Sequence, residues 1–418
     1  MTARAEIIWT TLLFIAGVLT IGFIFFTLFP GKVPATVWEY FTPAEVEKAR
    51  HYQQIMRMTS ILAFLSKVVI LVLLLYSTRA NVWAEKIFHL VGGRYYLALL
   101  VYFVFIWFIL KAVDLPFNFY GSYIVQHQWE FSTQTLMSWW SDYLKGSVLD
   151  IVLSGIGVTL LFWATGRWPH MWWTMASLFL TVWLIISTFL WPLIIAPLFN
   201  RFEPINEGPI KTMVTKLADR AGLQVNEILV MDASSRTTKA NAYFTGLGMT
   251  KRIVLYDNLL SDYSIEEVEA VVAHEMAHWR QGHIARGLIW GVLANFLVLA
   301  LLHMVLRLTF TYEIARPGPY PIQLLVAILL FTQLVFFIAQ PIQNRISRNY
   351  EIEADRVALE LTGNPDAVIQ LHVNLTKKNL GDVAPPAYIE WLTYSHPSPI
   401  SRIEAVKEWK DLHKGAKK

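Results

Sequence analysis

Long apolar stretches are the dominant pattern of the chain. A helix needs about 20 mostly apolar residues to cross the hydrocarbon core of a bilayer. Seven stretches come close to that length, at residues 7–29, 60–77, 95–113, 149–165, 172–198, 284–308 and 322–340. We therefore predict a mainly α-helical, polytopic membrane protein with seven transmembrane helices. The first stretch is too long for the apolar core of a signal peptide, so we expect it to remain as a membrane helix.

Charged residues interrupt some of these stretches, for example Lys67 and Asp150. An ionisable side chain inside a span commonly faces a cavity or a charged partner. For Lys67 a second interpretation is equally good, because a lysine can extend its ammonium group to the membrane surface.

Two polar regions, residues 199–283 and 341–418, lie outside the apolar stretches. Two predicted spans separate them, so both lie on the same side of the membrane and can fold together into one domain. The prediction divides the chain into residues 1–198 with five spans, 199–283, 284–340 with two spans, and 341–418.

The first polar region has the pattern of a small α+β domain. Residues 206–223 have the spacing of an amphipathic helix. Three β-rich runs follow, at residues 227–231, 240–247 and 252–256. Ser264 and Glu267 then form a capping box. We expect the helix that starts there to continue into the sixth span.

Composition agrees with a membrane protein and limits the chemistry. Only 16% of the residues are charged, against about 25% in soluble domains. The net charge of +4 is small and scattered, so we expect no nucleic-acid partner. Lys and Arg near the span ends favour a cytoplasmic location for the polar regions. The chain has no cysteine, so any zinc must bind through nitrogen and oxygen.

A His-Glu-x-x-His motif occupies residues 274–278. The four-residue spacing places the imidazoles of His274 and His278 on one helical face, where both can bind the same metal ion. Glu275 is then positioned to act on a water molecule at the metal. A chance match is the alternative, but these polar residues would be costly to bury without a role. His283 would lie on the opposite face of a continuous helix, so we do not expect it to be a ligand.

A catalytic zinc ion also needs a third protein ligand and an open position. Glu351 and Glu353 are the candidates, in an acidic segment that follows the seventh span. Glu351 and Asp355 share a helical face, whereas Glu353 points elsewhere. An ordinary solvated acidic turn is the alternative. With the first motif present, we favour Glu351 as the ligand and Asp355 as a residue that supports the site or transfers protons.

Several segments between about residue 196 and residue 405 occur in the order of one known family. They read Leu198-Phe-Asn200-Arg-Phe202, Ala240-Asn241-Ala242-Tyr243-Phe244-x-Gly246, Ile253-Val-Leu-Tyr-Asp257, His274-Glu-Met-Ala-His278-Trp279-x-x-Gly282-His283, Arg348-Asn-Tyr-Glu351-x-x-Ala354-Asp355 and Ser395-His396-Pro397-x-x-x-x-Arg402. With these motifs the chain resembles the type 1 CAAX prenyl proteases, which are integral-membrane zinc endopeptidases.

The resemblance implies a role for each matching residue. It makes His274, His278 and Glu351 the ligands of one zinc ion per chain. It makes Glu275 the general base and acid, and Asp355 a proton donor or a partner of a ligand.

The resemblance also implies contacts with the substrate. Asn241, Ala242 and Tyr243 would belong to an edge strand that pairs with the substrate backbone. His396 and Arg402 would stabilise an oxyanion. Simpler interpretations stay open, because Asn241 could cap a turn and Arg402 could pair with Glu404.

The resemblance implies a zinc endopeptidase whose seven helices enclose a chamber, with the small α+β protease domain attached. We expect a monomer that acts on a peptide or protein substrate, lipid-modified or membrane-associated. The compact chain favours a bacterial member, in the plasma membrane with its protease domain in the cytoplasm. A quality-control protease for membrane proteins would have the same catalytic residues. A non-catalytic transporter or scaffold is a remote alternative, against which the intact Glu275 argues.

Overall fold

Seven helices of the computed structural model, which describes residues 3–246, 251–315 and 317–414, are long and apolar enough to cross a membrane. They are α1 (Ala3–Leu28), α2 (Pro43–Tyr76), α4 (Tyr95–Phe119), α6 (Leu136–Arg167), α7 (Trp172–Leu190), α11 (His283–Thr309) and α13 (Leu324–Thr362). Each of them contains most or all of one predicted apolar stretch. The mainly α-helical class and the seven transmembrane helices are therefore confirmed.

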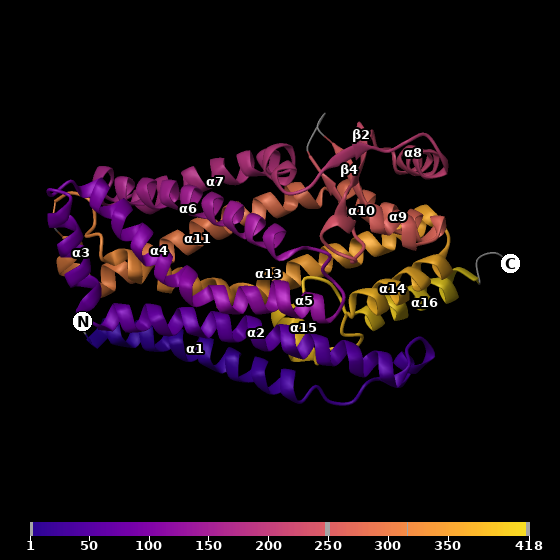
Figure 1. Ribbon diagram of the computed structural model, residues 1–418, viewed down its shortest axis with the longest axis horizontal. Coiled ribbons are helices and arrows are strands. Elements are labelled where there is room, and N and C mark those ends of the chain that lie inside the picture. The colour runs from indigo at the N-terminus through magenta and orange to yellow at the C-terminus, as the bar shows by residue number, and fades with distance from the viewer. Residues whose placement is uncertain (1–2, 247–250, 316, 415–418) are drawn as a thin grey trace.

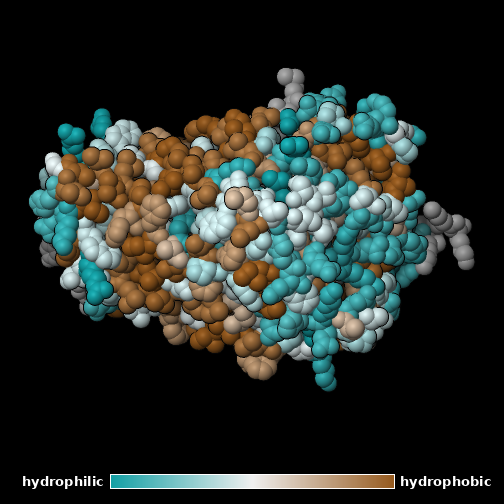
Figure 2. Space-filling view, in the orientation of Figure 1, coloured by the Kyte–Doolittle hydropathy of each residue, from teal (hydrophilic) through white to brown (hydrophobic). Residues whose placement is uncertain are grey.

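The long helices run beside one another along the longest axis of the molecule, and the polar part gathers at one end (Figure 1). Figure 2 shows the same division on the surface, where hydrophobic residues cover the helical part and hydrophilic residues cover most of the other end. The membrane helices also form a closed circuit of packed neighbours, in the order α1, α2, α4, α6, α7, α11 and back to α1.

The polar end contains a four-stranded sheet in the order β1-β2-β4-β3. Its strands are β1 (Phe202–Pro204), β2 (Glu227–Met231), β3 (Ala242–Thr245) and β4 (Arg252–Tyr256). β2 and β4 are parallel, and both outer strands are antiparallel to their neighbours. β3 is thus an edge strand. It is shorter than the predicted run, of which Leu247 lies outside the described residues, and β1 was not predicted.

Within the described ranges, six helices complete the α+β part. They are α8 (Pro209–Ala221), α9 (Asp257–Asp262), α10 (Ile265–Arg280), α14 (Pro365–Asn379), α15 (Ala387–Thr393) and α16 (Pro399–Lys414). Three short helices connect the spans: α3 (Arg79–Leu90), α5 (Val125–Gln128) and α12 (Thr311–Ile314). α10 begins at the predicted capping box, in which the Ser264 hydroxyl accepts a hydrogen bond from the Glu267 N–H. Its apolar face packs against α13 and brings the two polar regions together.

The expected continuous helix from the capping box into the sixth span is wrong. α10 ends at Arg280 and α11 begins at His283. Between them Gly282 has a φ of +67°. This left-handed conformation ends an α-helix, and glycine adopts it without the steric cost of a Cβ atom. The chain therefore turns immediately after the His-Glu-x-x-His motif.

Charged residues inside the membrane helices are paired across neighbouring helices. Lys67 Nζ lies 2.8 Å from Asp114 Oδ1, which favours the charged-partner interpretation of this lysine. Lys111 Nζ lies 2.9 Å from Asp150 Oδ2. These two pairs connect α2, α4 and α6.

Candidate active site

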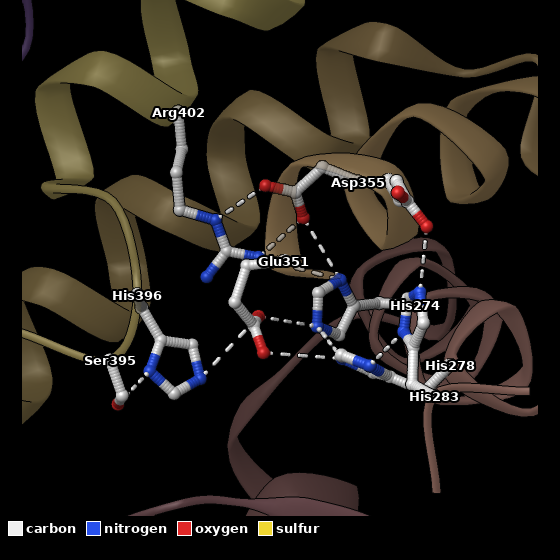
Figure 3. A network of polar contacts seen from close by, with 9 residues as sticks. His274, His278, His283, Glu351, Asp355, Ser395, His396 and Arg402 are labelled. Carbon is white, nitrogen blue, oxygen red and sulfur yellow. Dashed lines mark hydrogen bonds and ion pairs between the residues drawn. The ribbon is translucent and has the colours of Figure 1, made fainter. Parts of the chain in front are cut away.

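Two helices from the separate polar regions bring the predicted ligands together. α10 carries His274 and His278, and α13 carries Glu351. The Nε2 atoms of the imidazoles lie 3.1 Å apart. The Glu351 carboxylate lies 3.1 Å from His274 Nε2 and 3.4 Å from His278 Nε2. Figure 3 shows the three side chains converging on one point.

This group of side chains has the chemistry of a metal site. One ligand atom from each of the three residues lies within 4.8 Å of the other two. Glu351 is buried, and within the described ranges its Oε2 has no hydrogen-bond partner of regular geometry. Two imidazole nitrogens and one carboxylate form a donor set that suits zinc. The residues therefore fit a zinc ion.

Glu275 lies beside this group on α10 and is partly buried. Burial raises the pKa of its carboxyl group, against the opposite effect of the imidazoles of His274 and His278. The backbone of Phe244 in β3 lies close to the Glu275 side chain and also lowers the pKa of its carboxyl group. The carboxyl group is thereby held between the metal ligands and the edge strand.

Asp355 and Arg402 form an ion pair behind His274. Asp355 Oδ1 lies 2.9 Å from His274 Nδ1, and Asp355 Oδ2 accepts a hydrogen bond of 2.7 Å from Arg402 Nε. Burial lowers the pKa of His274, but hydrogen bonds to Asp355 and Glu351 outweigh it and raise the pKa to about 10. Arg402 therefore pairs with Asp355 and not with Glu404, whose carboxylate accepts a hydrogen bond from Thr36.

His396 lies on the open side of the cluster, in the segment between α15 and α16. Its Nδ1 is 2.8 Å from Ser395 Oγ, and its Nε2 is 3.4 Å from Glu351 Oε2. Burial lowers the pKa of its imidazole, against the effect of the Glu351 charge. With 55% of its side chain exposed, His396 can still meet a substrate.

His283 contacts a ligand without belonging to the metal group. Its Nδ1 lies 2.8 Å from His278 Nδ1, and its Nε2 lies 3.0 Å from Glu353 Oε2. The group of possible metal ligands in the described ranges does not include it. The geometric reason given for this expectation was wrong, because the turn at Gly282 brings the ring back toward α10.

The predicted substrate-binding residues lie along the edge strand. Ala242 and Tyr243 belong to β3, and Asn241 precedes it. The N–H of Tyr256 donates to the Asn241 carbonyl over 3.1 Å. Since peptide groups alternate in direction along an antiparallel strand, Ala242 and Phe244 turn theirs to the free edge. The Asn241 side chain also accepts a hydrogen bond from the Ala242 N–H.

Sequence reasoning missed several residues of the site. The ring centroids of Phe244 and Trp279 lie 4.2 Å apart, and both residues line a cavity of about 290 Å³ beside Glu275 and His278. On the other side, His372 lines a cavity of about 460 Å³ together with His396 and Arg402. His372 carries no motif around it, and only the packing of α14 against α10 and α16 reveals it.

Comparisons with known proteins agree along most of the chain. The model of "Peptidase family M48" matches residues 204–410, and that of "CAAX prenyl protease N-terminal, five membrane helices" matches residues 25–201. "CAAX prenyl protease 1" of Saccharomyces cerevisiae is 31% identical, over 70% of this chain and 68% of its own length. "Uncharacterized metalloprotease YhfN" of Bacillus subtilis is also 31% identical, over 72% of each chain. The crystal structure of S. mikatae Ste24p superimposes with a TM-score of 0.82 and 26% identity, over 97% of this chain and 99% of that one.

Proposed function

Because this chain belongs to peptidase family M48 and, within it, to the type 1 CAAX prenyl proteases, we propose that His274, His278 and Glu351 hold one zinc ion for peptide-bond hydrolysis. The chain is a multi-pass membrane metalloendopeptidase that acts on peptide or protein substrates. One observation carries the proposal. The three ligand atoms, from helices far apart in the sequence, meet within 4.8 Å next to Glu275.

The catalytic step follows from the positions of the side chains. A zinc ion at this site supplies Lewis-acid chemistry that lowers the pKa of a water molecule to about 7. Glu275 accepts the proton of the attacking water and returns it to the leaving amine. Its raised pKa supports this exchange, because a carboxyl group with a higher pKa is a stronger base.

Asp355 and Arg402 are better suited to orientation than to proton transfer. Both carboxylate oxygens of Asp355 are engaged, Oδ1 with His274 and Arg402 and Oδ2 with Arg402. This supports a role for Asp355 in fixing the imidazole of His274, with Arg402 holding Asp355 in place. His396 is then the group best placed to stabilise an oxyanion, because its side chain is the more exposed.

The edge strand offers a place for an extended substrate. A peptide that adds to β3 would hydrogen-bond to the outward carbonyl groups of Ala242 and Phe244, between which lies Tyr243. The Ala242 N–H already donates to the Asn241 side chain. The scissile bond would then lie near Glu275, since the backbone of Phe244 contacts that carboxyl group.

The ion pairs of the membrane helices support an aqueous chamber inside the ring of helices. The side chains of Lys111 and Asp150 are 29% and 42% exposed although they lie within predicted spans. Charged groups exposed to lipid are costly, so these side chains must face water. The closed circuit of helices supplies an interior for that water.

The proposal also covers the peptidase domain, its side of the membrane, the oligomeric state and the substrate. Residues 199–283 and 341–418 form one peptidase domain, as the packing of α10 against α13 and α14 supports. We place this domain on the cytoplasmic side and the protein as a monomer. The name of the yeast relative supports a prenylated peptide as substrate.

Replacement of the Glu275 carboxylate tests the proposal. Glu275→Gln is expected to retain one zinc ion per chain and to lose peptidase activity. Glu266→Gln serves as the matched control, because Glu266 is exposed in the first turn of the same helix. Cleavage of a farnesylated peptide and of an unmodified membrane protein is measured in both variants. Retained cleavage by Glu275→Gln, with contaminating proteases excluded, contradicts the proposal, and preference for the unmodified protein points to quality control.

A further inference from the structure

The segment that carries His396 has little regular structure of its own. It joins the short helix α15 to α16, and residues 394–398 belong to neither. The His396 ring contacts only Ser395 and Glu351 among the interactions of the described chain. Its position therefore depends on how the backbone around it is anchored.

Helix α13 anchors one side of this segment. Arg348 Nη1 donates hydrogen bonds to the carbonyls of Glu390 at 2.8 Å and of Tyr394 at 2.6 Å. Asn344 donates to the Leu392 carbonyl at 2.7 Å. Both donors precede the ligand Glu351 on the same helix, so the anchor and the metal group share one element.

The membrane helix α2 anchors the other side. Arg57 Nη2 donates to the Tyr394 hydroxyl at 2.8 Å and pairs with Asp382 Oδ2 at 2.8 Å. Arg57 is 8% exposed and Asp382 is 1% exposed. Within the described ranges the other oxygen of Asp382 has no partner, so this carboxylate depends on Arg57.

Tyr394 is consequently held at both ends, through its carbonyl by Arg348 and through its hydroxyl by Arg57. His396 follows two residues later. A buried charge pair holds its geometry because either partner left alone would be costly. The structure thus connects α2 to the catalytic cluster through one tyrosine side chain.

We propose that Arg57 is a positioning residue for His396 and acts through the hydroxyl group of Tyr394. The inference rests on the proposed role of His396 in the reaction. It extends the site to a membrane helix that carries neither a metal ligand nor a general base.

Tyr394→Phe is the variant that tests this link, because it removes the hydroxyl and keeps the ring. In the full-length protein, with a farnesylated fluorogenic peptide, kcat is expected to fall about tenfold, as for the loss of one hydrogen bond to a charged group. KM and metal content are expected to stay unchanged. Gln53→Met is the matched control, since Gln53 of α2 binds the Leu380 carbonyl and not Tyr394.

A double-mutant cycle separates positioning from general stability. In a His396→Ala background, Tyr394→Phe is expected to change kcat less than twofold, because the residue to be positioned is gone. Arg57→Lys, which keeps a charge beside Asp382, provides a second variant for the same cycle.

Three results overturn the inference in different ways. An equal loss from Tyr394→Phe with and without His396 shows that the hydroxyl acts elsewhere. Wild-type kcat in Tyr394→Phe shows that the contact is structural only. Wild-type kcat in His396→Ala shows that His396 has no role in the reaction. The zinc site and the role of Glu275 are tested separately, by Glu275→Gln.

Discussion

Replacement of Asp355 by asparagine separates two functions of one carboxylate. Asp355 contacts His274 through Oδ1 and pairs with Arg402 through both carboxylate oxygens. Its side chain is 15% exposed, and that of Arg402 is 16% exposed. Asp355→Asn keeps the shape, removes the charge and leaves the largely buried Arg402 guanidinium without its paired carboxylate.

The two effects have different magnitudes. Loss of a carboxylate that orients a metal-bound histidine weakens metal binding by about 10–100-fold, or about 1.4–2.7 kcal/mol. An unpaired buried charge lowers the free energy of unfolding by about 3 kcal/mol. The double variant Asp355→Asn/Arg402→Met removes the unpaired charge, so most of the stability is expected to return, while zinc binding stays weak.

Zinc affinity is measured by competition with a chelating dye, and stability by thermal unfolding in detergent. Glu360→Gln is the control, because Glu360 lies on α13 in an exposed pair with Arg356; such pairs contribute about 0–1 kcal/mol. Zinc affinity of Asp355→Asn equal to that of the wild type refutes the orienting role. Recovery of affinity together with stability in the double variant refutes the separation of the two effects.

Two further predictions concern His372 and the inner face of α6. Burial lowers the pKa of His372 from 6.5 to about 3, so the unfolded chain binds the proton more readily and stability is lost as pH falls through this window. At pH 5 the free energy of unfolding is lower by about 2 kcal/mol for this reason. Thermal unfolding of His372→Leu should not show this loss. An equal effect of pH on the wild type and on His372→Leu contradicts the reasoning. On α6, Ser154 bonds to Asp150, whereas Val152 is exposed on another face. In this cysteine-free chain, a charged thiol reagent is expected to label Ser154→Cys and not Val152→Cys, and the reverse pattern contradicts an aqueous interior.

Local sequence patterns were sufficient to predict the membrane helices and the shared helical face of His274 and His278. A run of apolar residues determines a span by its length alone. The imidazoles of His274 and His278 share a face because four residues make about one helical turn. Glu351 was different, because no local pattern separates a ligand from an ordinary acidic residue, and the family resemblance was needed.

Contacts between distant segments could not be read from the sequence. Arg57 and Tyr394 are separated by more than three hundred residues, and nothing near either residue marks the pair. The position of His283 depended on a single glycine in the left-handed conformation. The roles of Asn241, His396 and Arg402 remain predictions, and the proposed variants address those of His396 and Arg402.

Helix α13 also sets the distance between the predicted end of the seventh span and Glu351. It runs without a break from Leu324 in the membrane to Thr362, with Pro341 near the predicted end of the span. Glu351 follows ten residues after Pro341, which is about 15 Å at 1.5 Å per residue. If Glu351 holds the zinc ion as proposed, the number of helical residues between Pro341 and Glu351 fixes the height of the metal site above the predicted end of the span. One residue inserted between Pro341 and Glu351 would rotate Glu351 about the helix axis by about 100°. The distance between Pro341 and Glu351 along α13 therefore cannot be changed in small steps.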